Sequence, residues 1–232
     1  PARASRLWRF GRWLIGASIG GFLIAQGDKL VLSGLVEAET LGVFAIAALW
    51  VEAGRQVLMK IASFVFVPSF SMVLRDRAED IGPVFRRALG LFGLACIAVT
   101  TLTAVVAVLA ISHLYDVRYS EAGAMALVLS FRNLTLGFVV VEHFLLARAD
   151  SRAVAIAKLA GGMLAVVCMI IAHSLFGLTG AIVVAACSGV PSAAVMLGYQ
   201  DVRRHMDARM GWFCLFCATA ACVGVAAHLF PN

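Results

Sequence analysis

Among the ionisable side chains inside the long apolar runs of this 232-residue sequence, six are candidates for chemistry. A charge in such a run is costly to bury in hydrocarbon, so each one marks a hypothesis about function. Their chemistry is ion pairing and anion binding, because the arginine fork matches the oxygens of phosphate and carboxylate groups and stays charged. We therefore take the whole set as candidate substrate-binding residues: Asp28, Lys29, Glu52, Arg55, Lys60 and Arg132.

Helical spacing brings part of this set together. Glu52, Arg55 and Gln56 stand at positions i, i+3 and i+4, which share one face of a helix. At a rise of ~1.5 Å per residue, Glu52 and Arg55 lie roughly 18–22 Å below the outer membrane boundary, and Arg132 reaches a similar depth on its own run. Two interpretations follow. Arg55 and Arg132 line a cationic cavity beside Glu52, or the three side chains pair with one another and hold helices together.

The other polar residues of the runs carry alternatives of their own. Asp28 and Lys29 form a local pair or an interhelical contact at a hydrated cavity wall, or they bind a ligand or a coupling ion directly. Lys60 lies at the cavity floor or extends to the membrane interface. Glu142 and His143 are interpreted as interfacial and solvated, with a proton relay as the alternative.

Signatures of catalysis are missing from the sequence. It holds no Walker A loop, GxSxG or HExxH motif. All six cysteines lie in apolar runs and are interpreted as small packing residues. Cys214 and Cys217 form a CxxC, but no second cysteine pair or spaced histidine pair accompanies it, which argues against a metal or redox site. We expect no catalytic residue, no metal and no cofactor, and we expect that the protein is not an enzyme.

The composition identifies the solvent of the fold. Hydrophobic residues make up 62% of the chain and charged residues 14%, with a mean hydropathy of +0.96. A soluble fold of this length could not bury so much apolar surface, and no strand-like alternation of apolar and polar residues is visible. The net charge of +6 resides in segments between apolar runs, which points to membrane topology and anionic lipid and away from nucleic acid.

The apolar runs predict an all-α, polytopic transmembrane helical bundle of about seven spans. Each run is long enough to cross a hydrocarbon core of about 30 Å. Pro68 is expected to end or kink the second span, and Gly189 and Pro191 to soften the sixth. The predicted spans are residues 13–36, 41–74, 88–111, 122–147, 153–173, 180–199 and 210–229.

Alternation of charge between the connections predicts the orientation. The segments 1–12, 75–87, 148–152 and 201–209 are rich in Lys and Arg, whereas the alternate connections are acidic, mixed or uncharged. The positive-inside rule then places the N-terminus in the cytoplasm of a cell whose inner membrane holds all the spans.

The first two spans resemble a known family. The matching stretches are Phe10-Gly11, QGDKL at 26–30, LGVFAIA at 41–47, FVPSFS at 66–71 and FRRAL at 85–89. Over residues 10–90 they resemble the start of the second half of bacterial polysaccharide flippases, the O-antigen and exopolysaccharide repeat-unit exporters of the multidrug/oligosaccharidyl-lipid/polysaccharide superfamily. The resemblance implies a MATE-like fold of two pseudo-symmetric lobes, of which this chain is the second plus one extra helix. By that pattern residues 1–12 are a basic interfacial segment, 13–200 a six-helix lobe, and 201–232 a cytoplasmic loop with the additional helix.

The same resemblance implies a function. A flippase of this kind moves undecaprenyl-diphosphate-linked oligosaccharide from the cytoplasmic to the periplasmic leaflet for surface polysaccharide biosynthesis. Its expected partners are the lipid-linked oligosaccharide, membrane lipids, a separate N-terminal lobe, and the polysaccharide polymerisation and export machinery. The alternatives are a multidrug or cation antiporter of the same superfamily, a membrane glycosyl enzyme of the same pathway, and a non-transporting lobe that needs a partner chain. A short outer connection at 113–121 argues against the glycosyl enzyme.

Overall fold

The computed structural model describes residues 2–76, 81–199 and 208–230. Within these ranges the chain is helical and contains no strand, which confirms the predicted all-α bundle. The helices are α1 (Ala2–Leu32), α2 (Ala38–Asp76), α3 (Ile81–Leu114), η2 (Val117–Tyr119), α4 (Ser120–Ser130), α5 (Arg132–Thr135), η3 (Leu136–Phe138), α6 (Val139–Ala147), α7 (Ser151–Ala186), α8 (Val190–Gly198) and α10 (Ala208–Leu229).

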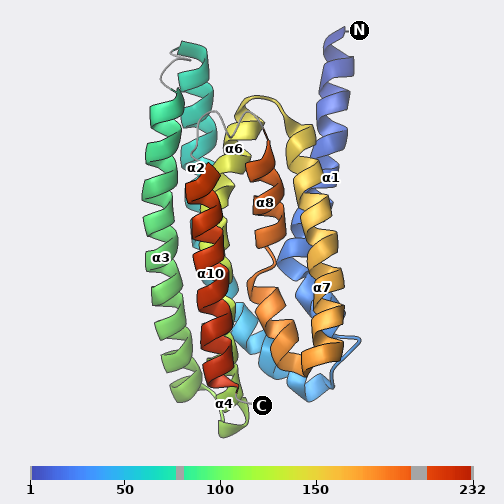
Figure 1. The fold of residues 1–232 in the computed structure, drawn as a ribbon, viewed down its shortest axis with the longest axis vertical. Helices are drawn as coiled ribbons and strands as arrows, with labels where there is room; N and C mark the ends of the chain where they lie inside the picture. Colours follow the sequence, from blue (N-terminus) through green and yellow to red (C-terminus); the bar gives the residue numbers. More distant parts are fainter. Residues whose placement is uncertain (1, 77–80, 200–207, 231–232) are drawn as a thin grey trace.

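The described helices fit the predicted passes across a membrane. Five stretches are long and apolar enough to span one: Gly11–Leu32, Ala38–Asp76, Ile81–Leu114, Val117–Ala147 and Ser151–Ala186. The last of them reverses direction at Gly177, whose φ of 61° is open to glycine at no steric cost. The return segment of α7 continues into α8, α10 follows, and the two ends of the chain lie at opposite ends of the bundle (Figure 1).

Two predicted boundaries are wrong. The connection expected at 75–87 is largely helical, because α2 continues to Asp76 and α3 begins at Ile81. Pro83 fits there since the first turn of a helix needs no N–H donor. Pro68 does not end α2, which runs through it for eight further residues.

The fourth and sixth passes are both broken near mid-span. The fourth, predicted as one helix over 122–147, is divided into α4, α5, η3 and α6. The sixth is interrupted between Ala186 and Val190, as the prediction for Gly189 and Pro191 anticipated, and Pro191 occupies the first turn of α8. Irregular backbone within a membrane survives where it is enclosed by protein or lines a cavity.

The apolar core forms two clusters with a gap between them. One is built from residues such as Phe66, Phe85 and Phe144, near the end of the bundle where α2 meets α3. The other surrounds Phe44 and Leu129 towards the opposite end. Along α1, Ala17 belongs to the first cluster and Leu32 to the second, and the stretch between them holds the polar residues. The site therefore lies in a layer between two apolar cores.

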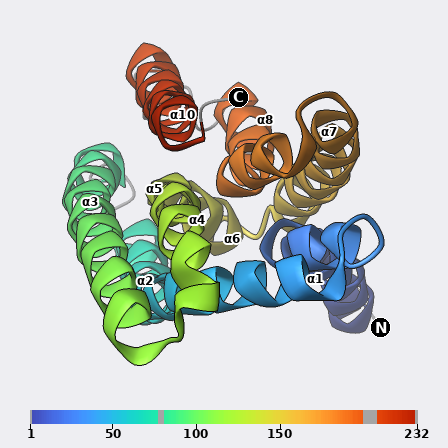
Figure 2. The ribbon, with the colours of Figure 1, turned by 90° about the horizontal axis from the view of Figure 1, so that it is seen from below.

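The helices form two groups that lie side by side, and both groups contribute residues to this layer. α1 packs along α7, which is followed by α8, while α2, α3, α4 and α6 pack on one another (Figure 2). Small residues permit the close approach of α1 and α7. A Cβ on Gly20 would overlap the backbone of Lys158, and one on Gly162 would lie 2.8 Å from the carbonyl oxygen of Gly20.

The basic connections gather at one end of the bundle, as alternation of charge requires. The guanidinium groups of Arg12 and Arg152 lie 5.7 Å and 5.5 Å from the centre of the Trp13 ring, so the start of α7 lies beside residues 12–13 of α1. The end of α2 lies at this same end (Figure 1). The segment 201–209 lies outside the described residues except for the start of α10 at Ala208.

The Gly20 contact yields a first prediction. Replacing Gly20 with Ala inserts a methyl group against the Lys158 backbone, and overpacking of this kind costs about 1–3 kcal/mol. The variant should unfold at a lower temperature in detergent and accumulate less in membranes. Gly90→Ala is the matched control, because nothing lies within 4 Å of the Cβ position there. Equal unfolding temperatures for the two variants would contradict the close packing of α1 on α7.

Candidate functional site

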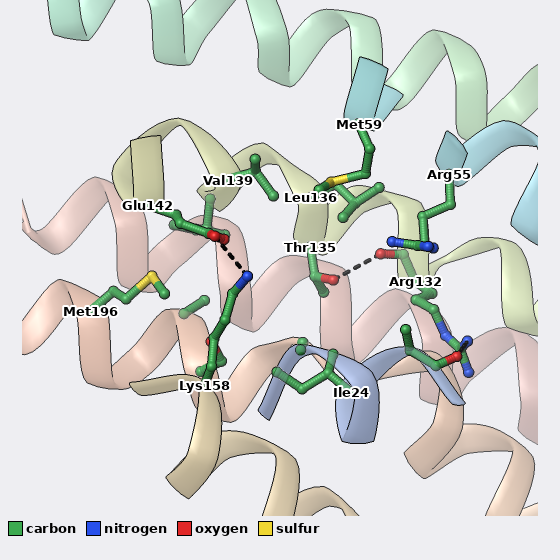
Figure 3. A pocket seen from close by; sticks show the side chains of 16 residues that line it. Ile24, Arg55, Met59, Arg132, Thr135, Leu136, Val139, Glu142, Lys158 and Met196 are labelled. Carbon is green, nitrogen blue, oxygen red and sulfur yellow. Dashed lines mark hydrogen bonds and ion pairs between the residues drawn. The ribbon is translucent and has the colours of Figure 1, made fainter. Parts of the chain in front are cut away.

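A cleft of about 100 Å³ lies in the polar layer between the two apolar cores. Its walls come from α1, α2, the α5–α6 segment, α7 and α8. Figure 3 shows Arg55, Arg132 and Lys158 reaching this space from three different elements. The polar residues that line it are Arg55, Arg132, Thr135, Glu142, Lys158 and Ser192.

Arg132 is a buried clamp between the two groups of helices. It stands at the midpoint of the stretch Val117–Ala147 and is only 6% exposed. Its Nη2 is paired with Asp28 Oδ2, its Nε donates to the carbonyl of Ala185 at 3.2 Å, and its Nη1 donates to the carbonyl of Ala25 at 3.4 Å. The Ala185 carbonyl belongs to the last turn of α7 and also accepts from the backbone N–H of Ser188 at 3.3 Å. Arg132 thus joins α5 to both α1 and α7.

Arg55 has a different environment. Its Nε and Nη2 each lie 2.6 Å from an oxygen of Glu52, one turn earlier on α2, in a bidentate pair. The Arg55 side chain is 22% exposed, and α2 places it near the middle of its 39 residues. Arg55 and Arg132 line one cleft, as the depth argument predicted, but they do not share Glu52 as a partner. Arg55 is the accessible arginine of the two.

A third ion pair lies deeper towards the basic end. Lys158 Nζ on α7 donates to Glu142 Oε1 on α6 at 2.6 Å, across the cleft (Figure 3). His143 is 6% exposed, and its Nδ1 lies 2.8 Å from the carbonyl oxygen of Val139. The prediction that Glu142 and His143 are solvated is therefore wrong. Sequence reasoning missed Lys158 as a site residue, although it is the one charge in the predicted span 153–173 and so carried the relevant signal.

Four candidates do not line the cleft: Asp28, Lys29, Glu52 and Lys60. Lys29 Nζ donates to Gln26 Oε1 at 2.8 Å, and the backbone N–H of Lys29 donates to Asp28 Oδ1 at 2.8 Å. Asp28 pairs with Arg132 and so makes an interhelical contact, one of the alternatives predicted for it. Lys60 is exposed on α2. A substrate-binding role for Lys29 and Lys60 stays a prediction.

The two broken passes meet beside Arg132. The Thr135 hydroxyl donates to the carbonyl of Arg132 at 2.7 Å, and a Cβ on Gly189 would overlap that same hydroxyl. Ser188 Oγ donates to the carbonyl of Ile24 at 3.2 Å, which ties the second break to α1. Asn133 is fully buried next to Gly54, where an added Cβ would lie 3.1 Å from its Nδ2. Both breaks are therefore enclosed by close contacts.

The described part of the chain contains no cluster of potential metal ligands. No group of three or more His, Cys, Asp or Glu side chains there could hold an ion. The cysteines with described side chains are free, and Cys96 and Cys222 are buried as packing residues. Cys214, and with it the predicted CxxC, lies outside the residues whose side chains are described.

The fold and the cleft define a polytopic helical membrane protein with a charged site between two apolar cores. Residues 2–124 match the family model described as "Polysaccharide biosynthesis protein". This match covers more than half of the 232 residues, so the chain belongs to that family, and the resemblance seen in its first two spans is confirmed. It includes Asp28, Glu52 and Arg55 but ends before Arg132. No curated protein matches the chain, and no solved structure does.

The two kinds of ion pair differ in what their loss should cost. Asp28→Asn leaves the Arg132 guanidinium buried without its counter-charge, and breaking such a pair costs about 3–5 kcal/mol. Thermal unfolding in detergent should show a large loss of stability for this variant. Glu52→Gln is the matched control, and its effect should be smaller because Arg55 is more exposed. An Asp28→Asn variant as stable as Glu52→Gln would refute the role of Arg132 as a clamp.

Proposed function

We propose that this chain is one lobe of a transporter that flips undecaprenyl-diphosphate-linked oligosaccharide from the cytoplasmic to the periplasmic leaflet. Its family is one of polysaccharide biosynthesis, and its apolar helices make it a membrane protein. The observation that carries the proposal is an accessible arginine, Arg55, held at mid-span in a cleft that contains two further cations. No catalytic role is assigned to any residue, in keeping with a protein that is not an enzyme.

The substrate sets physical demands that this arrangement meets. A lipid-linked glycan keeps its isoprenoid tail in the bilayer while its diphosphate and sugars cross. The diphosphate therefore needs cations at mid-depth in place of water, and arginine supplies paired donors of matching geometry. Irregular backbone at mid-membrane is typical of transporter sites built from discontinuous helices, and here two broken passes meet beside the cleft.

The carboxylates of the cleft disfavour a cation antiporter. Such a protein needs an acidic group that is free to take a cation. Among the described residues of the cleft and its immediate surroundings, Glu52, Glu142 and Asp28 are each paired with a basic side chain. The cations of the cleft, by contrast, can take a phosphate in place of their carboxylate partner.

Arg55 gives the direct test. Replacing Arg55 with Ala removes a charged hydrogen-bond donor worth about 1.5–3 kcal/mol, which corresponds to a loss of transport of about tenfold or more. The readout is surface polysaccharide and accumulated lipid-linked repeat unit in a flippase-deficient strain complemented with the transporter, and the protein level is measured by immunoblot. Val57→Ala, two residues further along α2 at a side chain that is 52% exposed and outside the cleft, should leave export unchanged. Normal export by the Arg55→Ala variant would rule out the proposed role.

The partner lobe is a separate part of the proposal, because alternating access requires two lobes moving around a central cavity. Expression of this chain with and without a first-lobe chain separates the possibilities. Rescue only by the pair supports the two-lobe transporter. Rescue by this chain alone would show that it assembles its own partner and would contradict the need for a separate lobe.

Orientation is proposed from the gathering of basic connections at one end of the bundle, with the N-terminus in the cytoplasm and the protein in the inner membrane. A membrane-impermeant maleimide should label Val117→Cys, whose parent residue is 84% exposed at the opposite end, through the periplasm of cells with a permeable outer membrane. Asp76→Cys, at the basic end, should be labelled only after the inner membrane is disrupted. The reverse pattern would invert the proposed topology.

A further inference from the structure

We infer that Lys158 binds a phosphate group of the substrate, and that Glu142 occupies this phosphate site when no ligand is present. The inference rests on the proposed function and deepens it, because it assigns a diphosphate subsite to a pair outside the candidates drawn from the sequence. Three features support it: the accessibility of the Lys158–Glu142 pair, the unused N–H donors of Lys158, and the shape of the space around its amine.

Accessibility separates this pair from the Arg132 clamp. The side chains of Lys158 and Glu142 are 19% and 12% exposed, against 8% and 1% for Arg132 and Asp28. A ligand entering the cleft reaches Lys158 without disturbing the clamp. The pair also spans the two groups of helices, since Lys158 is on α7 and Glu142 on α6.

The ammonium group of Lys158 has N–H donors beyond the one that Glu142 accepts. An ammonium group has three N–H donors, and within the described part of the chain its one hydrogen-bonding acceptor is Glu142. Arg132, by contrast, uses Nε, Nη1 and Nη2 on three different acceptors. The remaining donors of Lys158 face the cleft and are available to the oxygens of an incoming anion.

The space around the amine suits a compact oxyanion. Gly21 forms part of the facing wall, and an added Cβ there would lie 3.6 Å from Lys158 Nζ, so the glycine keeps this space open. Ser192 lines the cleft from α8, is 7% exposed, and its hydroxyl has no partner among the described residues. The cleft, of about 100 Å³, has room for a compact oxyanion such as a phosphate group.

Position then suggests an order of contact. Lys158 lies seven residues into α7, ~10 Å from its basic end, whereas Arg55 lies near the middle of α2. In the proposed orientation a headgroup arriving from the cytoplasm meets Lys158 first and Arg55 next. A phosphate that replaces the Glu142 carboxylate exchanges one oxyanion for another, so the amine stays compensated throughout, while Glu142 loses its hold on α7. Binding and the release of a contact between the two groups of helices are thereby the same event.

The experiment measures binding, not export. The full chain in zwitterionic lipid nanodiscs is titrated by calorimetry with farnesyl diphosphate, inorganic pyrophosphate and uncharged farnesol. Glu142→Gln removes the competing carboxylate and should tighten diphosphate binding by about tenfold, which is about 1.4 kcal/mol. Lys158→Gln should lose that binding, and Lys158→Arg should retain it. Glu121→Gln, an exposed carboxylate beyond the far end of the cleft, should bind like the parent protein.

The outcomes divide cleanly. Tighter binding of farnesyl diphosphate than of pyrophosphate assigns the ligand to a lipid, and the reverse assigns it to a free phosphate compound; both support the site. Unchanged or weaker binding by Glu142→Gln, or parent-like binding by Lys158→Gln, overturns it. A lower unfolding temperature in both variants with no change in diphosphate affinity identifies the pair as a structural contact and also overturns it. Loss of export in Arg55→Ala alongside such a result would leave the proposed function standing while this inference fails.

Discussion

The pairing of Arg132 with Asp28 is the interaction on which the rest of this structure depends. A membrane offers no water to a charge at mid-span, so each partner is admitted only because the other is there. Arg132 also donates to carbonyls of α1 and α7, so it is a buried point at which the two groups of helices are joined. The apolar cores on either side contribute packing contacts, which are not directional. Burial of these side chains adds little to helix association, since lipid is as apolar as the cores. The polar layer therefore sets how the two groups lie against each other.

The breaks in the fourth and sixth passes depend on the same lack of water in the middle of the membrane. At the break after α7 the carbonyl of Ala185 accepts from the backbone N–H of Ser188 at 3.3 Å and also from Arg132 Nε. The fourth pass is irregular just after Arg132, where Thr135 returns a bond to the backbone and Gly189 of the other broken pass comes close. Each break supplies the groups or the space that the other lacks. A break of this kind would be costly against lipid, so its presence marks an enclosed, polar part of the protein.

Most of the architecture follows from the sequence because hydropathy and charge indicate which residues face lipid and which face water. The apolar runs indicated the passes, and the basic segments indicated which connections share an end. Helix ends were less accessible: hydropathy marks where a run leaves the membrane, but α2 and α3 stay helical beyond it, so the connection at 75–87 was drawn too long. The breaks after Arg132 had no glycine–proline signal like that at Gly189 and Pro191. Pairing was the hardest to foresee, because whether Arg132 meets Glu52 or Asp28 depends on how helices are rotated, which spacing within one helix cannot tell.

Exposure and bond number distinguish residues that the sequence presents as alike. Arg55, Arg132 and Lys158 are all cations in apolar runs, and each holds a carboxylate. Arg132 is enclosed and uses its donors on several acceptors, so replacing its partner would cost stability before it could alter binding. Arg55 and Lys158 face the cleft and depend on fewer partners, and for them an incoming phosphate can take the place of a carboxylate. The proposed transporter lobe thus uses one kind of interaction both to hold its helices together and to bind an anion, because burial protects one pair from exchange and leaves the others open to it.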